Sequence, residues 1–131
     1  MLLDQALLDK VSAEAKDSPR LRMNFNLHES LDSKVQRLFN AMEPGTIVPI
    51  QRHQNTAETM LLVRGKMNVY FHNQAGDITE IFVLSPKNGV YGVHIPKGQW
   101  HSVEVLESGT VMFEVKEGPY APLSNEDILE R

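Results

Sequence analysis

The chain has 131 residues, a length typical of one domain, and its 41% hydrophobic and 23% charged residues are ordinary for a soluble globular protein. The formal net charge is −4 and no basic run is present, which argues against a nucleic-acid partner or an anionic membrane partner. The absence of cysteine excludes disulfides and thiolate metal ligands. No apolar stretch approaches the ~20 residues of a membrane helix. The first residues show no basic region followed by an apolar core, so we expect no signal peptide and a cytoplasmic location.

The N-terminal segment has a helical pattern. Leu3, Leu7, Val11 and Ala15 recur at every fourth position. This spacing predicts an amphipathic helix within residues 1–18, and Ser18-Pro19 is a suitable end for it. We expect the helix to cover one side or edge of a sheet.

The segment that follows has polar residues at even positions. Arg22, Asn24, Asn26 and His28 share one face if the chain is extended there. Such a face either meets solvent or forms the wet wall of a pocket, and the pattern leaves both readings open.

From Val35 onward the period becomes two, although residues 35–42 could also form a helix capped by Asp32 or Ser33. Short β-rich runs separated by turn residues predict a β-sandwich or barrel of about eight to ten strands. Pro49 argues for a sheet edge or a bulge. The acidic segment Asn125–Arg131 is expected to be a frayed tail. The other predicted strands are Thr46–His53, Thr59–Val63, Met67–His72, Ile78–Leu84, Val90–Ile95, His101–Leu106 and Thr110–Lys116.

Two separate stretches supply groups that can bind a metal. Gln51 and His53 lie two apart and share one face of a strand, and Glu58 follows five residues later. Downstream, His101 follows the turn sequence Pro96-Lys97-Gly98. Imidazole nitrogen with carboxylate or amide oxygen suits one divalent transition metal, namely Zn, Fe, Mn, Ni or Co. We therefore predict a metal site formed by Gln51, His53, Glu58 and His101.

These stretches resemble the paired signature motifs of the cupins. The first motif is G-x5-H-x-H-x3or4-E-x6-G, and Gly45, His53, Glu58 and Gly65 fall in register, with Gln51 in place of the first histidine. The second is G-x5-P-x-G-x2-H-x3-N. Its Pro, second Gly and His are matched by Pro96, Gly98 and His101, whereas Val90 and Val105 replace the leading Gly and the final Asn.

The chain also resembles, more closely, the WbuC-type cupin-fold metalloproteins, which are encoded near bacterial O-antigen genes. This resemblance covers roughly residues 20–120 and is carried by Asn26–Leu31, Val35–Ala41 and Phe113–Tyr120. It implies an all-β cupin barrel (a double-stranded β-helix, or jelly roll) with one N-terminal α-helix, and it decides for a strand at residues 35–42. The implied division is a helix at 1–18 packed on a barrel at 19–120, with a C-terminal tail at 121–131, all in a single domain.

The role of Gln51 has two readings. Its side-chain oxygen can bind a metal, as the glutamine does in the cupin-like phosphomannose isomerases, or the residue can hold a bound water beside the metal. With all four groups bound, an octahedral metal keeps two open positions. Open positions favour a Lewis-acid role toward an oxygen ligand.

Three functions are compatible with this site. The first is a metal-dependent enzyme, an isomerase, epimerase or dioxygenase, acting on a small oxygen-rich substrate such as a sugar or enediol. His28 is the first candidate acid or base, ahead of Glu104 and Tyr120, and Asn26, His28 and Tyr120 are candidate substrate contacts. The second is a non-catalytic module that binds a sugar or acid through the metal. The third is a structural domain with a vestigial site. Because exposed sheet edges invite pairing, we also expect a homodimer.

Overall fold

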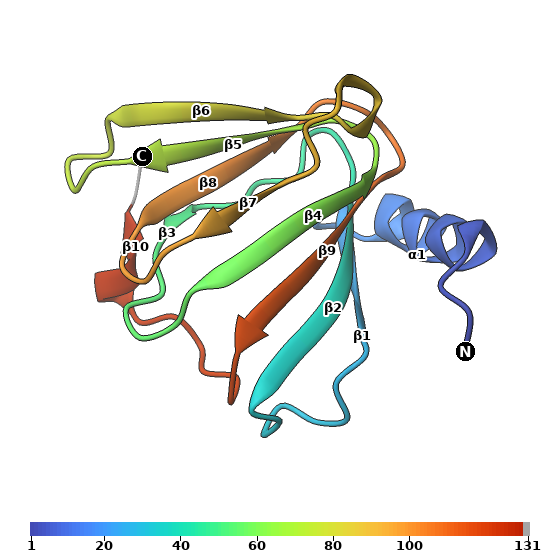
Figure 1. The fold of residues 1–131 in the computed structure, drawn as a ribbon, viewed down its shortest axis with the longest axis horizontal. Helices are drawn as coiled ribbons and strands as arrows, with labels where there is room; N and C mark the ends of the chain where they lie inside the picture. Colours follow the sequence, from blue (N-terminus) through green and yellow to red (C-terminus); the bar gives the residue numbers. More distant parts are fainter. Residues whose placement is uncertain (130–131) are drawn as a thin grey trace.

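The strands of residues 1–129, which the computed structural model describes, form two antiparallel sheets that face each other (Figure 1). A single α-helix, α1, precedes them in this part of the chain. The first sheet, called sheet A, has the strand order β1 (Arg22–Asn26), β2 (Val35–Met42), β9 (Thr110–Glu117), β4 (Glu58–Arg64) and β7 (Gly92–Ile95). The second, sheet B, has the order β10 (Ile128–Leu129), β3 (Ile50–Gln51), β8 (Trp100–Val105), β5 (Met67–His72) and β6 (Ile78–Leu84). This architecture confirms the predicted all-β fold with one N-terminal helix.

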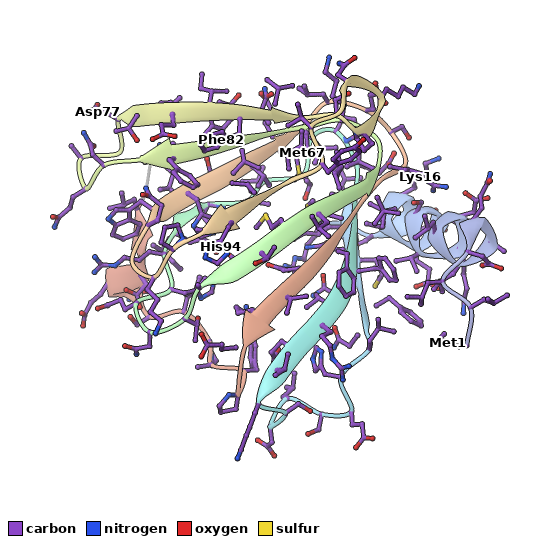
Figure 2. All side chains as sticks on the ribbon, in the orientation of Figure 1. Met1, Lys16, Met67, Asp77, Phe82 and His94 are labelled. Carbon is purple, nitrogen blue, oxygen red and sulfur yellow. The ribbon has the colours of Figure 1, made fainter. Side chains whose placement is uncertain are left out.

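The main hydrophobic core lies between the two sheets. It forms because each strand alternates, so that every second side chain points toward the opposite sheet. Figure 2 draws the side chains on the ribbon and labels Met67, a member of this core, and Phe82, which packs against it. Met60 and Leu62 of β4 belong to this core. Its buried members are Met42, Met60, Leu62, Met67, Val69, Phe71, Leu84, Ile95, Val105 and Met112.

A second core lies on the outer face of sheet A, where helix α1 (Gln5–Asp17) packs. Leu8, Val11 and Ala15 of the helix contact Phe39 and Val111 of the sheet, among others. The helix begins at Asp4, whose carboxylate accepts a hydrogen bond from the backbone N–H of Leu7, and it ends at Ser18 as expected. Leu3 precedes the helix and is exposed, so the predicted helical face starts one turn later than its spacing suggested.

The predicted strands agree closely with the structure in the centre of the chain. β2, β5 and β6 have the predicted bounds, and residues 35–42 form a strand rather than a helix. Gly65, in the turn between β4 and β5, has φ of 97°, and a Cβ there would lie 2.7 Å from the Cα atom of Thr110. Only glycine fits this turn, because both the backbone conformation and the space exclude a side chain.

The predicted strand Thr46–His53 is wrong in length, because only Ile50 and Gln51 are paired. Pro49 has no N–H to donate to a neighbouring strand. The hydroxyl of Thr46 donates to the carbonyl of Arg20 at 2.7 Å instead, which holds this segment outside the sheet.

The expectation of a frayed C-terminal tail is also wrong for residues 125–129. A short 3-10 helix (Asn125–Asp127) leads into β10, which pairs with β3. The carboxylate of Asp127 accepts hydrogen bonds from Arg52 Nε at 3.0 Å and from Gln54 Nε2 at 2.6 Å. Residues 130 and 131, the end of the predicted tail, lie outside the described residues.

Two further features of the fold are the burial of His72 on β5 and the short lengths of the helices. His72 precedes a polar turn in the sequence, yet it is buried, with Nε2 2.8 Å from Ser102 Oγ and Nδ1 3.1 Å from the carbonyl oxygen of Gly76. Residues 86–88 form a 3-10 helix between β6 and β7. Over residues 1–129, no helix has the length and apolar character needed to cross a membrane.

Candidate metal centre

Three of the four predicted metal ligands meet inside the barrel. One donor atom each from His53, Glu58 and His101 lies within 4.8 Å of the other two. His101 Nε2 is 2.8 Å from Glu58 Oε1, and His53 Nε2 is 3.8 Å from the same oxygen. Two ligands about 2.1 Å from one metal are roughly 3.0 Å apart at a right angle and roughly 3.4 Å apart at a tetrahedral angle. The separations are therefore close to those of ligands around one ion.

Backbone pairing brings these side chains together from distant parts of the sequence. Glu58 is the first residue of β4, and His101 is the second residue of β8. Gln51 pairs with His101 across β3 and β8. The carbonyl of His53 accepts a hydrogen bond from the N–H of Gly98 at 2.8 Å, which ties the first motif to the Pro-x-Gly turn of the second.

The hydrogen bonds of His101 direct its second ring nitrogen toward the other donors. Nδ1 lies 2.9 Å from the carbonyl oxygen of Gln99, so this nitrogen carries the proton and donates it. Nε2 then faces the Glu58 carboxylate, and in the neutral ring it can offer its lone pair to a metal. A hydrogen bond of this kind from the remote nitrogen is a common feature of metal-binding histidines.

Within residues 1–129, several of these donor atoms lack a hydrogen-bond partner. Both carboxylate oxygens of Glu58 and Nε2 of His101 are buried without a hydrogen bond of acceptable geometry. Leaving such atoms unsatisfied costs about 1–3 kcal/mol each, and more when the group is charged. An imidazole nitrogen and a carboxylate oxygen 2.8 Å apart attract each other only when a cation, either a proton or a metal ion, lies between them. The residues therefore fit a divalent cation.

The electrostatics keep the ligands in the states that a metal needs. Burial is the main cause that lowers the pKa of His53, so its imidazole is neutral near pH 7. Burial opposes the ionisation of Glu58, but the neighbouring Glu114 carboxyl group and, after it, the His101 imidazole outweigh this effect and lower the pKa of Glu58. Burial, followed by the neighbouring Glu58 carboxylate, raises the pKa of Glu114 well above its ordinary value. In the metal-free protein the carboxyl pair therefore keeps its proton on Glu114.

A cavity of about 400 Å³ adjoins this group of ligands. Gln51, His53 and His101 line it together with the Glu114 and Lys116 side chains of β9. Its volume lies in the range usual for small-molecule sites. Gln51 thus lies at the cavity beside His101. From this position it can either bind the metal directly or hold a water beside it. Direct binding of the metal by Gln51 stays a prediction.

The predicted substrate contacts are placed differently from one another. Tyr120 lines the cavity. Asn26 is exposed and His28 is buried outside the cavity lining, with its Nδ1 3.1 Å from both the N and the O atoms of the Arg37 backbone. Glu104, a weaker candidate for acid or base, accepts a hydrogen bond from the hydroxyl of Tyr70 on the outer face of sheet B. The roles predicted for Asn26 and His28 remain predictions without a contact that supports them.

Several cavity residues were missed by the sequence reasoning. Glu114 and Lys116 lie two and four residues after the buried Met112 on β9. Because side chains alternate along a strand, this spacing by itself places both side chains on the inward face. Arg22 and Asn24 belong to the polar face for which solvent and pocket were both open, and the structure favours the pocket. Asn40 has the same parity as Met42 and faces the same space.

A family model described as a domain of unknown function (DUF6016) matches residues 3–84 of the chain. No curated protein matches the sequence. Many solved structures share the fold.

KdgF from Halomonas sp. aligns with a TM-score of 0.62 and 15% identity over 79% of this chain and 84% of its own. The Cnp3 cupin domain from Schizosaccharomyces pombe aligns with a TM-score of 0.59 and 11% identity over 73% of this chain and 64% of its own. The capsular polysaccharide assembling protein CapF from Staphylococcus aureus has a TM-score of 0.58 and 23% identity, over 76% of this chain and 28% of its own. These likenesses show the cupin fold.

Proposed function

The chain belongs to the DUF6016 family and has the cupin fold, and on this premise we propose that it is a metal-dependent enzyme acting on a small, oxygen-rich substrate such as a sugar or enediol. We further propose a divalent transition metal (Zn, Fe, Mn, Ni or Co) bound by His53, Glu58 and His101, with Gln51 as a fourth ligand. Asn26 and His28 stay proposed substrate contacts, and His28 stays a proposed acid or base, on the strength of the sequence alone.

One observation carries the proposal. The buried, unpartnered atoms of Glu58 and His101 converge with His53 at the wall of a cavity large enough for a small molecule. A bound divalent metal would act as a Lewis acid that polarises a substrate oxygen. Isomerisation and epimerisation of sugars both need such polarisation, together with a group that moves a proton.

The cavity walls supply groups for proton transfer. Glu114 offers a carboxyl group, Lys116 an ammonium group and Tyr120 a hydroxyl group, and all three line the cavity with the proposed ligands. Each of these groups can hold or transfer a proton at a bound substrate. This is the observation that favours an enzyme over a non-catalytic binding module, for which ligands and apolar walls would suffice.

The finer assignment follows from the sequence resemblance. We propose that the chain is a WbuC-type cupin and that its substrate belongs to the metabolism of bacterial surface polysaccharides. The support is the set of motifs in residues 20–120 together with the fold shared with a capsular polysaccharide assembling protein.

The first test is elemental analysis of the purified protein by plasma mass spectrometry, before and after treatment with a chelator. The metal-loaded and metal-free forms are then incubated with a panel of aldoses, ketoses and sugar acids, and products are followed by NMR. We expect stoichiometric metal, and turnover that stops on chelation and returns when metal is restored. Protein without metal would show that the site is vestigial. Metal with saturable ligand binding but no turnover would assign the binding module instead.

A homodimer also remains part of the proposal. Sedimentation equilibrium over a range of concentrations tests it directly. A concentration-independent mass of 14.8 kDa would contradict a dimer.

A further inference from the structure

The cavity beside the metal ligands continues to a second polar group at the β1 side of sheet A. Arg20, Arg22, Asn24 and Asn40, here called the arginine–asparagine cluster, line this cavity. The same four residues also line an adjoining hollow of about 320 Å³. One continuous surface therefore runs from the proposed metal ligands to two guanidinium groups.

Strand register explains why the cluster forms. Arg22 and Asn24 alternate with Met23 and Phe25, which pack into the core beneath helix α1. Arg22 and Asn24 thus point to the inner side of sheet A. Asn24 pairs directly with Asn40 of β2, so Arg22 and Asn40 are diagonal neighbours on this face.

The positive charge of the cluster is not compensated within residues 1–129. Arg52 and Arg64 form ion pairs with Asp127 and Asp9, at 3.0 Å and 2.6 Å. Neither Arg20 nor Arg22 has a carboxylate partner within 4.0 Å among the described residues. Burial, and next the charge of Arg20, lowers the pKa of Arg22, which is the expected result of placing two cations together in a half-buried position.

The cluster also holds one unpaired donor and one unpaired acceptor. Nε of Arg22 and Oδ1 of Asn40 are both buried and have no hydrogen-bond partner in the part of the chain that the structure describes. Each such atom costs about 1–3 kcal/mol unless something satisfies it. An anionic oxygen would accept from Arg22, and a hydroxyl group would donate to Asn40. One molecule that carries both groups would satisfy both atoms.

We infer that the arginine–asparagine cluster binds the anionic group of a hydroxylated acid, a carboxylate or a phosphate monoester, whose remainder extends along the cavity toward the metal ligands. Guanidinium groups suit both anions because their N–H groups match the geometry of two oxygens. This inference deepens the proposed function by naming the class of substrate. The part of the inference that places the substrate against the metal ligands rests on the proposed function, whereas the binding of the anion by the arginine–asparagine cluster does not.

Titration calorimetry on the metal-loaded full chain tests the inference with three matched probes. D-Gluconate carries a carboxylate, glucose 6-phosphate carries a phosphate monoester, and D-glucose is neutral. A charge-assisted hydrogen bond is worth about 1.5–3 kcal/mol, so at least one anionic probe should bind about tenfold or more tightly than glucose. The stronger of the two anionic probes identifies the preferred anion.

Variants locate the effect. Arg22→Gln should reduce the affinity for the anionic probe about tenfold and leave glucose unchanged. Arg20→Gln, at an exposed side chain, provides a second variant that does not disturb packing. The matched control is Arg37→Gln. Arg37 is exposed on β2, and its side chain points away from the cavity. Its substitution removes one positive charge, as Arg22→Gln does. Equal binding of charged and neutral probes, no binding of either anion, or an equal loss in Arg37→Gln would each overturn the inference.

Metal content measured on the same samples separates this inference from the proposed function. We expect equal metal in the wild type, Arg22→Gln and Arg37→Gln. Anion binding that depends on Arg22 in a protein without metal would contradict the proposed function and keep the inference. Full metal content without Arg22-dependent anion binding would contradict the inference and leave the proposed metal site standing.

Discussion

The two ends of the barrel interior are built from the same strands but differ in chemistry. At one end the inward side chains are apolar and fully packed. At the other end the same alternation places ionisable groups around a cavity. Going along a strand from the polar to the apolar end, the inward residues are Glu58, Met60 and Leu62 on β4, His101, Val103 and Val105 on β8, and Lys116, Glu114 and Met112 on β9.

This difference separates stability from function within one fold. The apolar end buries surface that stabilises the folded state. The polar end buries the Glu58 carboxylate and leaves its oxygens unsatisfied, which costs stability unless a cation is bound. Substitutions at the two ends should therefore affect different measurements.

The largest effect is expected at the polar end, where His101→Ala or His53→Ala should remove nearly all bound metal. Water replaces a missing imidazole poorly, so affinity falls sharply. Metal content by plasma mass spectrometry is the readout. His94→Ala is the control, because this histidine is exposed and lies outside the cavity lining, 3.0 Å from the Thr59 hydroxyl. Full metal occupancy in both ligand variants would reject the assigned site.

Leu84→Ala should affect the apolar end alone. Leu84 is completely buried in the core, so its truncation should lower the free energy of unfolding by about 2–5 kcal/mol. Metal stoichiometry should not change under folding conditions. Val83→Ala is the control, because Val83 lies next to it on β6 and is exposed, and its effect should stay within about 0.5 kcal/mol. Loss of metal in Leu84→Ala would show that the two ends are coupled.

The pH dependence of stability should reveal the carboxyl pair. The pKa of Glu114 is raised above 4.5, so the metal-free folded protein keeps a proton that the unfolded chain releases. This contribution to stability is fully present below pH 4.5 and is lost as the pH rises through the folded-state pKa. Relative to wild type, Glu114→Gln should therefore gain stability as the pH rises from 4.5 toward neutrality.

Urea denaturation of the chelated proteins over this pH range measures the effect. Glu117→Gln, at an exposed position of the same strand, serves as the control. A difference between Glu114→Gln and wild type that does not change with pH would contradict the expected sign.

The smallest change is expected for Gln51→His, which supplies the commoner cupin ligand. Imidazole is a stronger donor than an amide oxygen, so the variant should hold its metal as well as or better than wild type. Competition with a graded series of chelators measures the difference. Weaker retention by Gln51→His would indicate that the amide has a specific role, such as holding a bound water.

Local patterns were sufficient for much of the fold and for the principal ligands. The period of two over residues 67–72 and 78–84 identifies β5 and β6, since strand alternation is a property of neighbouring residues. His53, Glu58 and His101 could be recognised because their spacing, with glycine and proline at fixed offsets, is written in two short motifs.

Longer-range pairing could not be read in the same way. Residues 46–49 have strand-forming composition, but their backbone finds no partner strand, whereas residues 128–129 look like a tail and pair with β3. His72 lies beside a polar turn in sequence, yet the neighbouring strand β8 covers it through Ser102. In each case the outcome depends on an element far away in the chain.

The sequence by itself determined which residues face inward, because side chains alternate along a strand whatever surrounds it. It also determined the chemical types available for a metal. Only the tertiary structure decided which inward residues meet at the same end of the barrel. Glu114 joins Glu58, and Arg22 joins Asn40, because antiparallel register between strands distant in sequence sets their height along the barrel, and no local pattern encodes that height.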